Sequence, residues 1–122
     1  MRYIFIAIIL LFTGCFQEKE VHYSHNKEKY YQVKLCKELK GEMEYRLSDR
    51  TRVDCLTNNY AIEVDWAKKW AEGIGQSLYY SQMTGKKPAV ALIITKKDKR
   101  YKKRLEKVAD RYNIKIFYLE KE

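Results

Sequence analysis

Three carboxylates lie in two neighbouring segments whose residue patterns predict β-strands. Asp54 belongs to residues 51–57, and Glu63 and Asp65 belong to residues 60–65, with an Asn-Asn turn between the segments. Such a hairpin brings the two strands side by side, and strand periodicity puts Glu63 and Asp65 on one face. Carboxylate oxygens suit Mg²⁺ or Mn²⁺, which activate a bound water and stabilise charge on a phosphate. The pattern predicts a site for a hard cation, but carboxylates on a solvated sheet face would give the same pattern.

A predicted helix at residues 66–84 could add a cation to this site. At about 100° per residue, Lys69, Gln76 and Tyr80 share one stripe of the helix, whereas Lys68 falls off it. The stripe lies opposite the apolar one, so the alternative is that it is simply the solvated face. The apolar stripe consists of Ala67, Trp70, Ala71, Ile74 and Leu78.

The elements that would position these residues alternate between helices and strands. Asn26 can cap, and Gly41 can end, a helix over residues 27–40. Glu38 lies at the edge of the apolar stripe of that helix, either as a boundary residue or as part of a buried polar site. The remaining elements are predicted as strands 42–47, 51–57 and 60–65, helix 66–84, strand 89–95, helix 97–112 and strand 114–119. This order, αβββαβαβ, predicts an α/β sandwich with a mixed sheet.

The chain resembles the PD-(D/E)XK nuclease superfamily, and in particular its RecB-like branch. Asp54 in RVDC and Glu63 in EVD match the two acidic positions of that superfamily, and Gln76 and Tyr80 match a Gln-x₃-Tyr helix motif. The resemblance extends over about residues 30–119. It implies a restriction-endonuclease-like αβββαβ core whose mixed sheet is flanked by helices, followed by a C-terminal helix and strand.

The resemblance also implies a metal-dependent nuclease. In that interpretation Asp54 and Glu63 hold Mg²⁺ or Mn²⁺, and Glu38 completes the metal site from the first helix. One position departs from the family: Asp65 stands two residues after Glu63, where a lysine is expected. Lys69 is then the candidate that replaces it, and the alternative is a catalytically silent binding or interaction protein of the same fold.

Basic residues exceed acidic ones, which favours a polyanionic partner. The chain has 25 Lys and Arg against 16 Asp and Glu, a net charge of +9 that becomes +8 without Arg2. The expected partner is nucleic acid, DNA in preference to RNA, and a basic run at residues 96–104 could follow phosphates. A second alternative to the nuclease is a structural protein of the cell envelope whose positive charge binds anionic lipid.

The first residues predict export. MRYIFIAIILLFTGC has a cation, a short apolar run and small residues before Cys15, which resembles a bacterial lipoprotein signal. We expect residues 1–14 to be a signal peptide, residues 15–26 a lipid-anchored tether and residues 27–122 the domain, facing the periplasm or the exterior. In an oxidising envelope the remaining Cys36 and Cys55 are expected to form a disulfide.

Overall fold

The structure is a computed structural model that describes residue 14 and residues 19–122. The predicted lipidation site, Cys15, and the predicted signal peptide apart from Gly14 lie outside these residues. The described chain forms three α-helices and five strands. In order, these are α1 (Glu28–Glu38), β1 (Glu42–Arg46), β2 (Arg52–Leu56), β3 (Tyr60–Trp66), a 3₁₀ turn η1 (Ala67–Lys69), α2 (Trp70–Thr84), β4 (Lys87–Ile94), α3 (Lys99–Tyr112) and β5 (Lys115–Glu120).

The strands form one mixed sheet in the order β1-β2-β3-β4-β5. β1, β2 and β3 are antiparallel neighbours, whereas β3, β4 and β5 run parallel. The parallel pairs are joined by α2 and α3, as crossover connections require. The expectation of an α/β fold with a mixed sheet flanked by helices is therefore confirmed.

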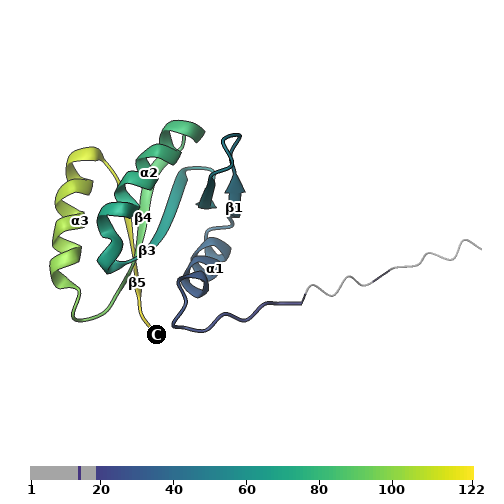
Figure 1. The fold of residues 1–122 in the computed structure, drawn as a ribbon, viewed down its shortest axis with the longest axis horizontal. Coiled ribbons are helices and arrows are strands. Elements are labelled where there is room, and N and C mark those ends of the chain that lie inside the picture. Colours follow the sequence, from purple (N-terminus) through teal and green to yellow (C-terminus); the bar gives the residue numbers. More distant parts are fainter. Residues whose placement is uncertain (1–13, 15–18) are drawn as a thin grey trace, which may run out of the picture.

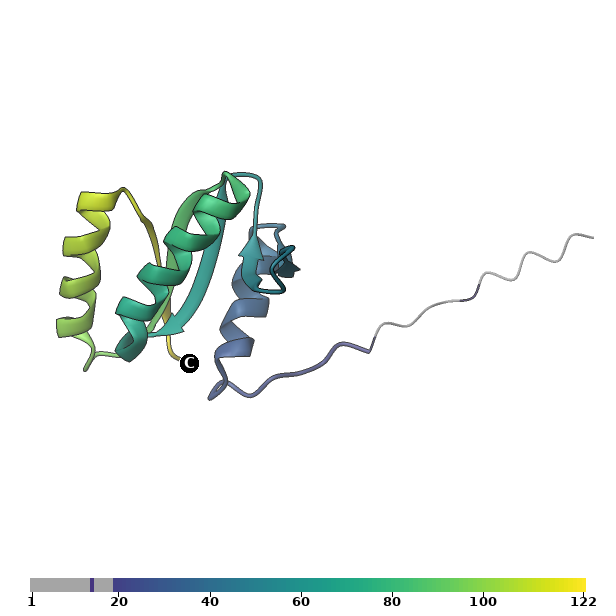
Figure 2. The same ribbon diagram turned by 45° about the horizontal axis from the view of Figure 1, so that its top comes forward.

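Helices cover both faces of the sheet. Figures 1 and 2 show α1 on one face and α2 with α3 on the other. β4 lies between them, and its residues from Ala89 to Ile94 are all buried. Ala91 and Ile93 pack in the α1 core, while Val90 and Leu92 pack in the core under α2 and α3. The continuous apolar run of this strand thus reflects burial on both faces.

A disulfide between Cys36 and Cys55 fastens α1 to the sheet, which confirms the predicted pairing. The Cα atoms of the two cysteines are 5.7 Å apart, within the range that a disulfide spans. Gly41 follows α1 and passes directly over the bond. A Cβ atom there would lie 2.5 Å from Sγ of Cys55 and 2.9 Å from Sγ of Cys36, so only glycine fits without displacing the sulfur atoms.

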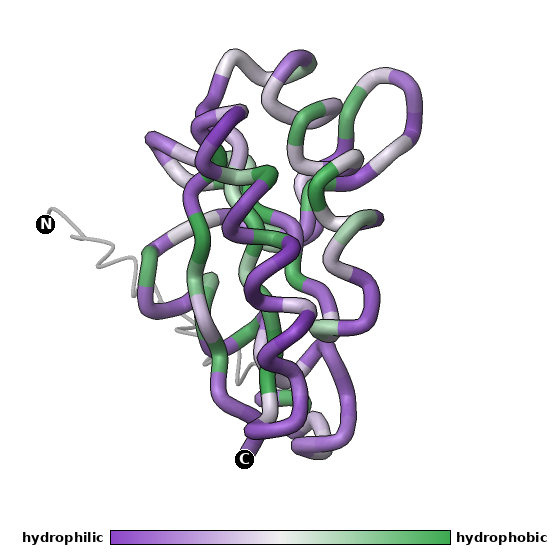
Figure 3. The backbone as a smooth tube through the Cα atoms, turned by 90° about the vertical axis from the view of Figure 1, so that its left-hand side faces the viewer, coloured by the Kyte–Doolittle hydropathy of each residue, from purple (hydrophilic) through white to green (hydrophobic). Residues whose placement is uncertain are grey.

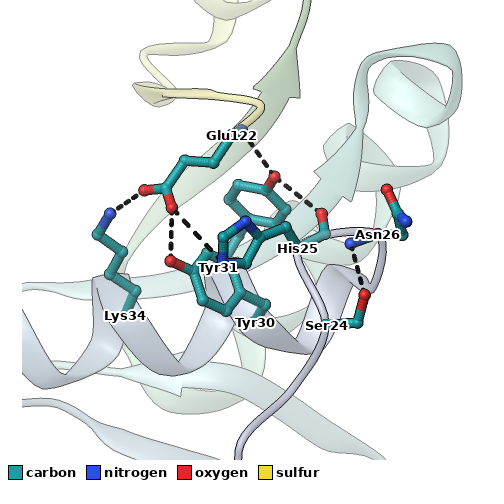
Figure 4. Close-up of polar contacts among 7 residues, drawn as sticks. All are labelled: Ser24, His25, Asn26, Tyr30, Tyr31, Lys34 and Glu122. Atoms are coloured by element: carbon teal, nitrogen blue, oxygen red, sulfur yellow. Dashed lines mark hydrogen bonds and ion pairs between the residues drawn. The ribbon is translucent and has the colours of Figure 1, made fainter.

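Glu122 holds the end of β5 against the start of α1, as Figure 4 shows. Its carboxylate accepts a hydrogen bond of 2.6 Å from Tyr30 and pairs with Lys34. Its main-chain N–H donates to the Tyr31 hydroxyl over 3.0 Å, and that hydroxyl donates to the carbonyl of His25 over 2.9 Å. These contacts join segments about ninety residues apart in the chain.

Candidate active site

Asp54 and Glu63 meet where the pairing of β2 and β3 stops. The two strands pair at Cys55–Ile62 and Leu56–Ala61. At the next residues along the two strands, carboxylate side chains accept hydrogen bonds from main-chain N–H groups. The N–H of Asp54 donates to Oε1 of Glu63 over 3.2 Å, and the N–H of Val64 donates to Oδ2 of Asp54 over 2.9 Å. The two carboxyl groups are also within hydrogen-bonding reach of each other. The structure therefore brings these two predicted site residues together.

Burial makes this pair costly to ionise. Glu63 is 3% exposed, and burial, followed by the charge of Asp54, raises its pKa to about 9. Burial also raises the pKa of Asp54. Two carboxylates this close cannot both lose their protons easily unless a cation compensates their charge. The pair is thus a place where a proton or a metal ion is held.

Asp65 shares a face of β3 with Glu63 and points toward α2. It is 6% exposed, and within residues 19–122 its Oδ2 atom has no hydrogen-bond partner. A Cβ atom on Gly73 of α2 would lie 2.9 Å from this oxygen. Burial, then the charges of Glu28 and Asp54, raise the pKa of Asp65 to about 7. Burial thus shifts this carboxyl group toward its protonated form.

Lys69 lies in η1, directly after β3. Its side chain is exposed, and its charge lowers the pKa of both Asp65 and Glu28, opposing the effect of burial. Lys68 is also exposed but is not among the main charges acting on either group. Of the two lysines, Lys69 is thus the one whose charge acts on Asp65 and Glu28, and it is not among the main charges acting on Asp54 or Glu63.

The first helix contributes a different glutamate from the one expected. Glu38 is exposed at the end of α1, and the main charges acting on Asp54, Glu63 and Asp65 do not include it. Glu28, in the first turn of the same helix, is half-buried, and burial followed by the charge of Asp54 raises its pKa. Nothing in the helical pattern marked Glu28, because it lies before the apolar stripe begins.

The buried face of α2 is displaced from the predicted apolar stripe, of which Trp70 and Ile74 are only partly buried against the core. Its buried residues are Gly73, Ser77 and Tyr80, whereas Leu78 is 37% exposed. The interpretation of the Tyr80 stripe as a solvated face is therefore wrong for Tyr80, which is 7% exposed and packs with Val53 and Ala61 of the sheet.

Two features explain why the expected angular positions of residues around α2 gave the wrong buried face. The 3₁₀ turn Ala67–Lys69 advances about 120° per residue, so it shifts the phase of the helix that follows. The small side chains of Gly73 and Ser77 also let α2 lie close to the sheet.

Gln76 and Tyr80, the two residues of the predicted helix motif, both lie on α2. Tyr80 is near enough that the charge of Glu63, after burial, raises the pKa of its hydroxyl. Gln76 is half-buried one turn earlier. The two residues of the Gln-x₃-Tyr motif thus differ in environment, and Tyr80 is the one in electrostatic contact with the candidate site.

Asp54 and Glu63 together offer two carboxylate ligands to a hard cation. Across residue 14 and residues 19–122, no three His, Cys, Asp or Glu side chains form a metal-binding group. Mg²⁺ nevertheless binds to one or two protein carboxylates and keeps several waters, so Asp54 and Glu63 suffice in number. Asp65, whose Oδ2 is unpartnered within residues 19–122, does not form a three-ligand group with this pair.

Comparisons with known proteins do not assign the chain to a group: no family, no curated protein and no solved structure matches it.

In the part of the chain that the structure describes, no helix is both long and apolar enough to span a membrane.

Proposed function

We propose that this domain is a metal-dependent nuclease of the PD-(D/E)XK type that acts on nucleic-acid phosphodiesters, DNA in preference to RNA. The observation that carries the proposal is the meeting of the Asp54 and Glu63 carboxyl groups at the end of the β2–β3 pairing. The resemblance in sequence supplies the reaction class, and the order of helices and strands supports it.

In this proposal Asp54 and Glu63 hold Mg²⁺ or Mn²⁺, which when bound would lower the pKa of a water and offset charge on the phosphate. Lys69 supplies the positive charge that Asp65 cannot supply. Its ammonium would hold the attacking water against the repulsion of the phosphate and stabilise the negative charge that develops in the transition state. Support comes from the effect of Lys69 on the pKa of Asp65.

The second candidate is a silent binding protein with the same fold. It is favoured by Asp65, which stands in place of the expected lysine, and by the use of both carboxylates as acceptors for main-chain N–H groups. A purely structural role for this pair needs no metal. The two candidates share a basic surface and differ only in metal-dependent cutting.

We further propose that the domain works in the cell envelope, anchored through lipid on Cys15. The Cys36–Cys55 disulfide supports an oxidising compartment, because such bonds rarely persist in the cytosol.

The test uses residues 16–122, with and without Mn²⁺ or Mg²⁺, on labelled DNA. We expect weak cutting that requires the metal and is lost in Glu63→Ala and in Lys69→Ala, while Lys68→Ala, the matched control, cuts normally. Cutting that survives Lys69→Ala would refute the role of this lysine. Tight DNA binding without cutting would establish the silent binder instead.

A second measurement does not depend on activity. Titration calorimetry with Mn²⁺ should detect binding to the wild-type protein and much weaker binding to Asp54→Asn, which removes a charge without changing the size of the side chain. Equal binding by both proteins would show that this carboxylate is not a ligand.

A further inference from the structure

A lysine-rich cavity of about 590 Å³ lies at the carboxyl ends of β4 and β5, beside the first turns of α3. Its lining carries four ammonium groups and one carboxylate, a net charge of +3. The carboxylate belongs to Glu120, and the ammonium groups belong to Lys96, Lys99, Lys102 and Lys121. We call this feature the lysine cavity.

The four lysines of the lysine cavity form no ion pairs within residues 19–122, and the nearby Asp98 carboxylate bonds to Thr95 of the lining instead. In the described part of the chain, no ion pair within 4.0 Å involves any of its four lysines or Glu120. Four like charges around one hollow repel each other, and an anion placed among them would relieve that repulsion. The cavity therefore fits a ligand that carries negative charge.

An aromatic ring lies beside these cations. The ammonium of Lys102 is 4.6 Å from the ring centroid of Tyr118 on β5, whose hydroxyl hydrogen-bonds to Glu106. Tyr118 is 39% exposed. Single-stranded nucleic acid is commonly bound by cations that meet its phosphates and by rings on which its bases stack. An exposed ring next to a cationic hollow favours this ligand over a lipid headgroup.

The topology of the sheet puts the lysine cavity and η1, which carries Lys69, at the carboxyl ends of the parallel strands. β3, β4 and β5 are parallel, so η1 after β3, Lys96 after β4 and Lys121 after β5 all follow carboxyl ends. Ala67 of η1 and Tyr101 of α3 belong to one apolar cluster. Figure 3, which views the molecule from the side of α3, shows this helix as mostly hydrophilic. Lysines thus follow the carboxyl ends of all three parallel strands, with Lys69 after β3, Lys96 after β4 and Lys121 after β5.

We propose that the lysine cavity binds backbone phosphates of a nucleic-acid strand and holds that strand along the carboxyl edge of the sheet, where Lys69 lies. The choice of nucleic acid rests on the proposed function, whereas the anionic character of the ligand rests on the cavity alone.

The test measures binding without chemistry. The full chain in non-ionic detergent and EDTA is titrated into fluorescently labelled single-stranded DNA at several salt concentrations. The variant Lys99→Ala/Lys102→Ala removes two cavity charges. The control Lys103→Ala/Lys107→Ala removes two charges from the same helix, at exposed positions outside the cavity lining.

For the cavity variant we expect affinity to fall about tenfold at about 0.1 M salt. Since each lost phosphate contact on a single strand changes the slope of log K against log salt by about 0.7, the slope should become shallower by about 1.4. The control should change the slope by less than half as much. Equal effects of the two pairs, or no effect of the cavity pair, would overturn the proposal.

Two further arms identify the ligand and separate this proposal from the nuclease. If the cavity variant lost binding to vesicles that contain phosphatidylserine but bound DNA normally, the ligand would be lipid and the proposal would be wrong. Cavity-dependent DNA binding by a wild-type protein that does not cut with Mn²⁺ would support the proposal and refute the nuclease. If the cavity variant bound and cut DNA normally, the nuclease would be supported and the proposal on the lysine cavity would be wrong.

Discussion

Replacement of Glu63 by glutamine should make the protein more stable at neutral pH and should remove much of its pH dependence. The pKa of Glu63 rises from an ordinary value of 4.5 to about 9 on folding. Between these values the folded state keeps a proton that the unfolded state releases. The contribution of this group to stability is therefore fully present below pH 4.5 and is lost as the pH rises toward 9.

The size of the effect follows from the width of this window. Each pH unit inside it lowers the free energy of unfolding by up to about 1.4 kcal/mol, so the loss reaches about 3 kcal/mol at pH 7. Glutamine is neutral at every pH and avoids this loss. Its Oε1 can still accept from the N–H of Asp54, and its amide can donate to the Asp54 carboxylate, so the contacts of the site should survive.

The assay is urea denaturation of wild-type and Glu63→Gln protein at pH 5, 7 and 8.5 without divalent metal. The difference in unfolding free energy should widen as the pH rises, in favour of the variant. Glu38→Gln, at an exposed position, is the control and should follow the wild type. Parallel curves for wild type and Glu63→Gln would show that Glu63 ionises normally in the folded protein, and the reasoning on its burial would be wrong.

Three other perturbations test the surroundings of the site. Gly73→Ala should destabilise the protein by about 1–3 kcal/mol in urea denaturation, because the new Cβ would lie 2.9 Å from a buried carboxylate oxygen. The control Gly75→Ala has open space around it and should stabilise the protein by up to about 1 kcal/mol. Equal effects of the two substitutions would contradict this packing. Replacing Cys36 and Cys55 together by alanine should cost about 3 kcal/mol by the same assay, and no loss would mean that the bond does not form in solution. Glu122→Ala should speed hydrogen exchange at the start of α1, and unchanged exchange would show that its contacts there do not persist.

The sequence was sufficient for the elements and for the central pair of carboxylates. Alternation along β2 and β3 and the turn between them determine which residues face each other, so local pattern alone predicts that Asp54 and Glu63 come together. Cys36 and Cys55 could be paired because two cysteines in an oxidising compartment leave one choice. These inferences depend only on local periodicity and on composition.

Features that depend on how elements approach one another could not be predicted. The buried face of α2 was missed because two of its three buried residues, Gly73 and Ser77, carry no hydrophobic signal. Glu28 was missed because it lies before the apolar stripe of α1 begins, so the helical pattern does not mark it. The lysine cavity requires the ends of β4 and β5 to lie together, and sequence separation conceals this.

The close approach of α2 at Gly73 has an evolutionary consequence for the residue at position 65. Lysine is longer than aspartate, and the backbone of α2 already lies against the Asp65 carboxyl group. A substitution that introduced the lysine expected of a PD-(D/E)XK nuclease would therefore leave its side chain no straight path and would force the helix outward. Under the proposed relationship to PD-(D/E)XK nucleases, the loss of the lysine at position 65 and the close packing of α2 at Gly73 depend on each other. A mutation that reverses only one of the two is therefore disfavoured. A lineage that took this route would have to supply the missing positive charge from outside β3, as proposed for Lys69 in η1.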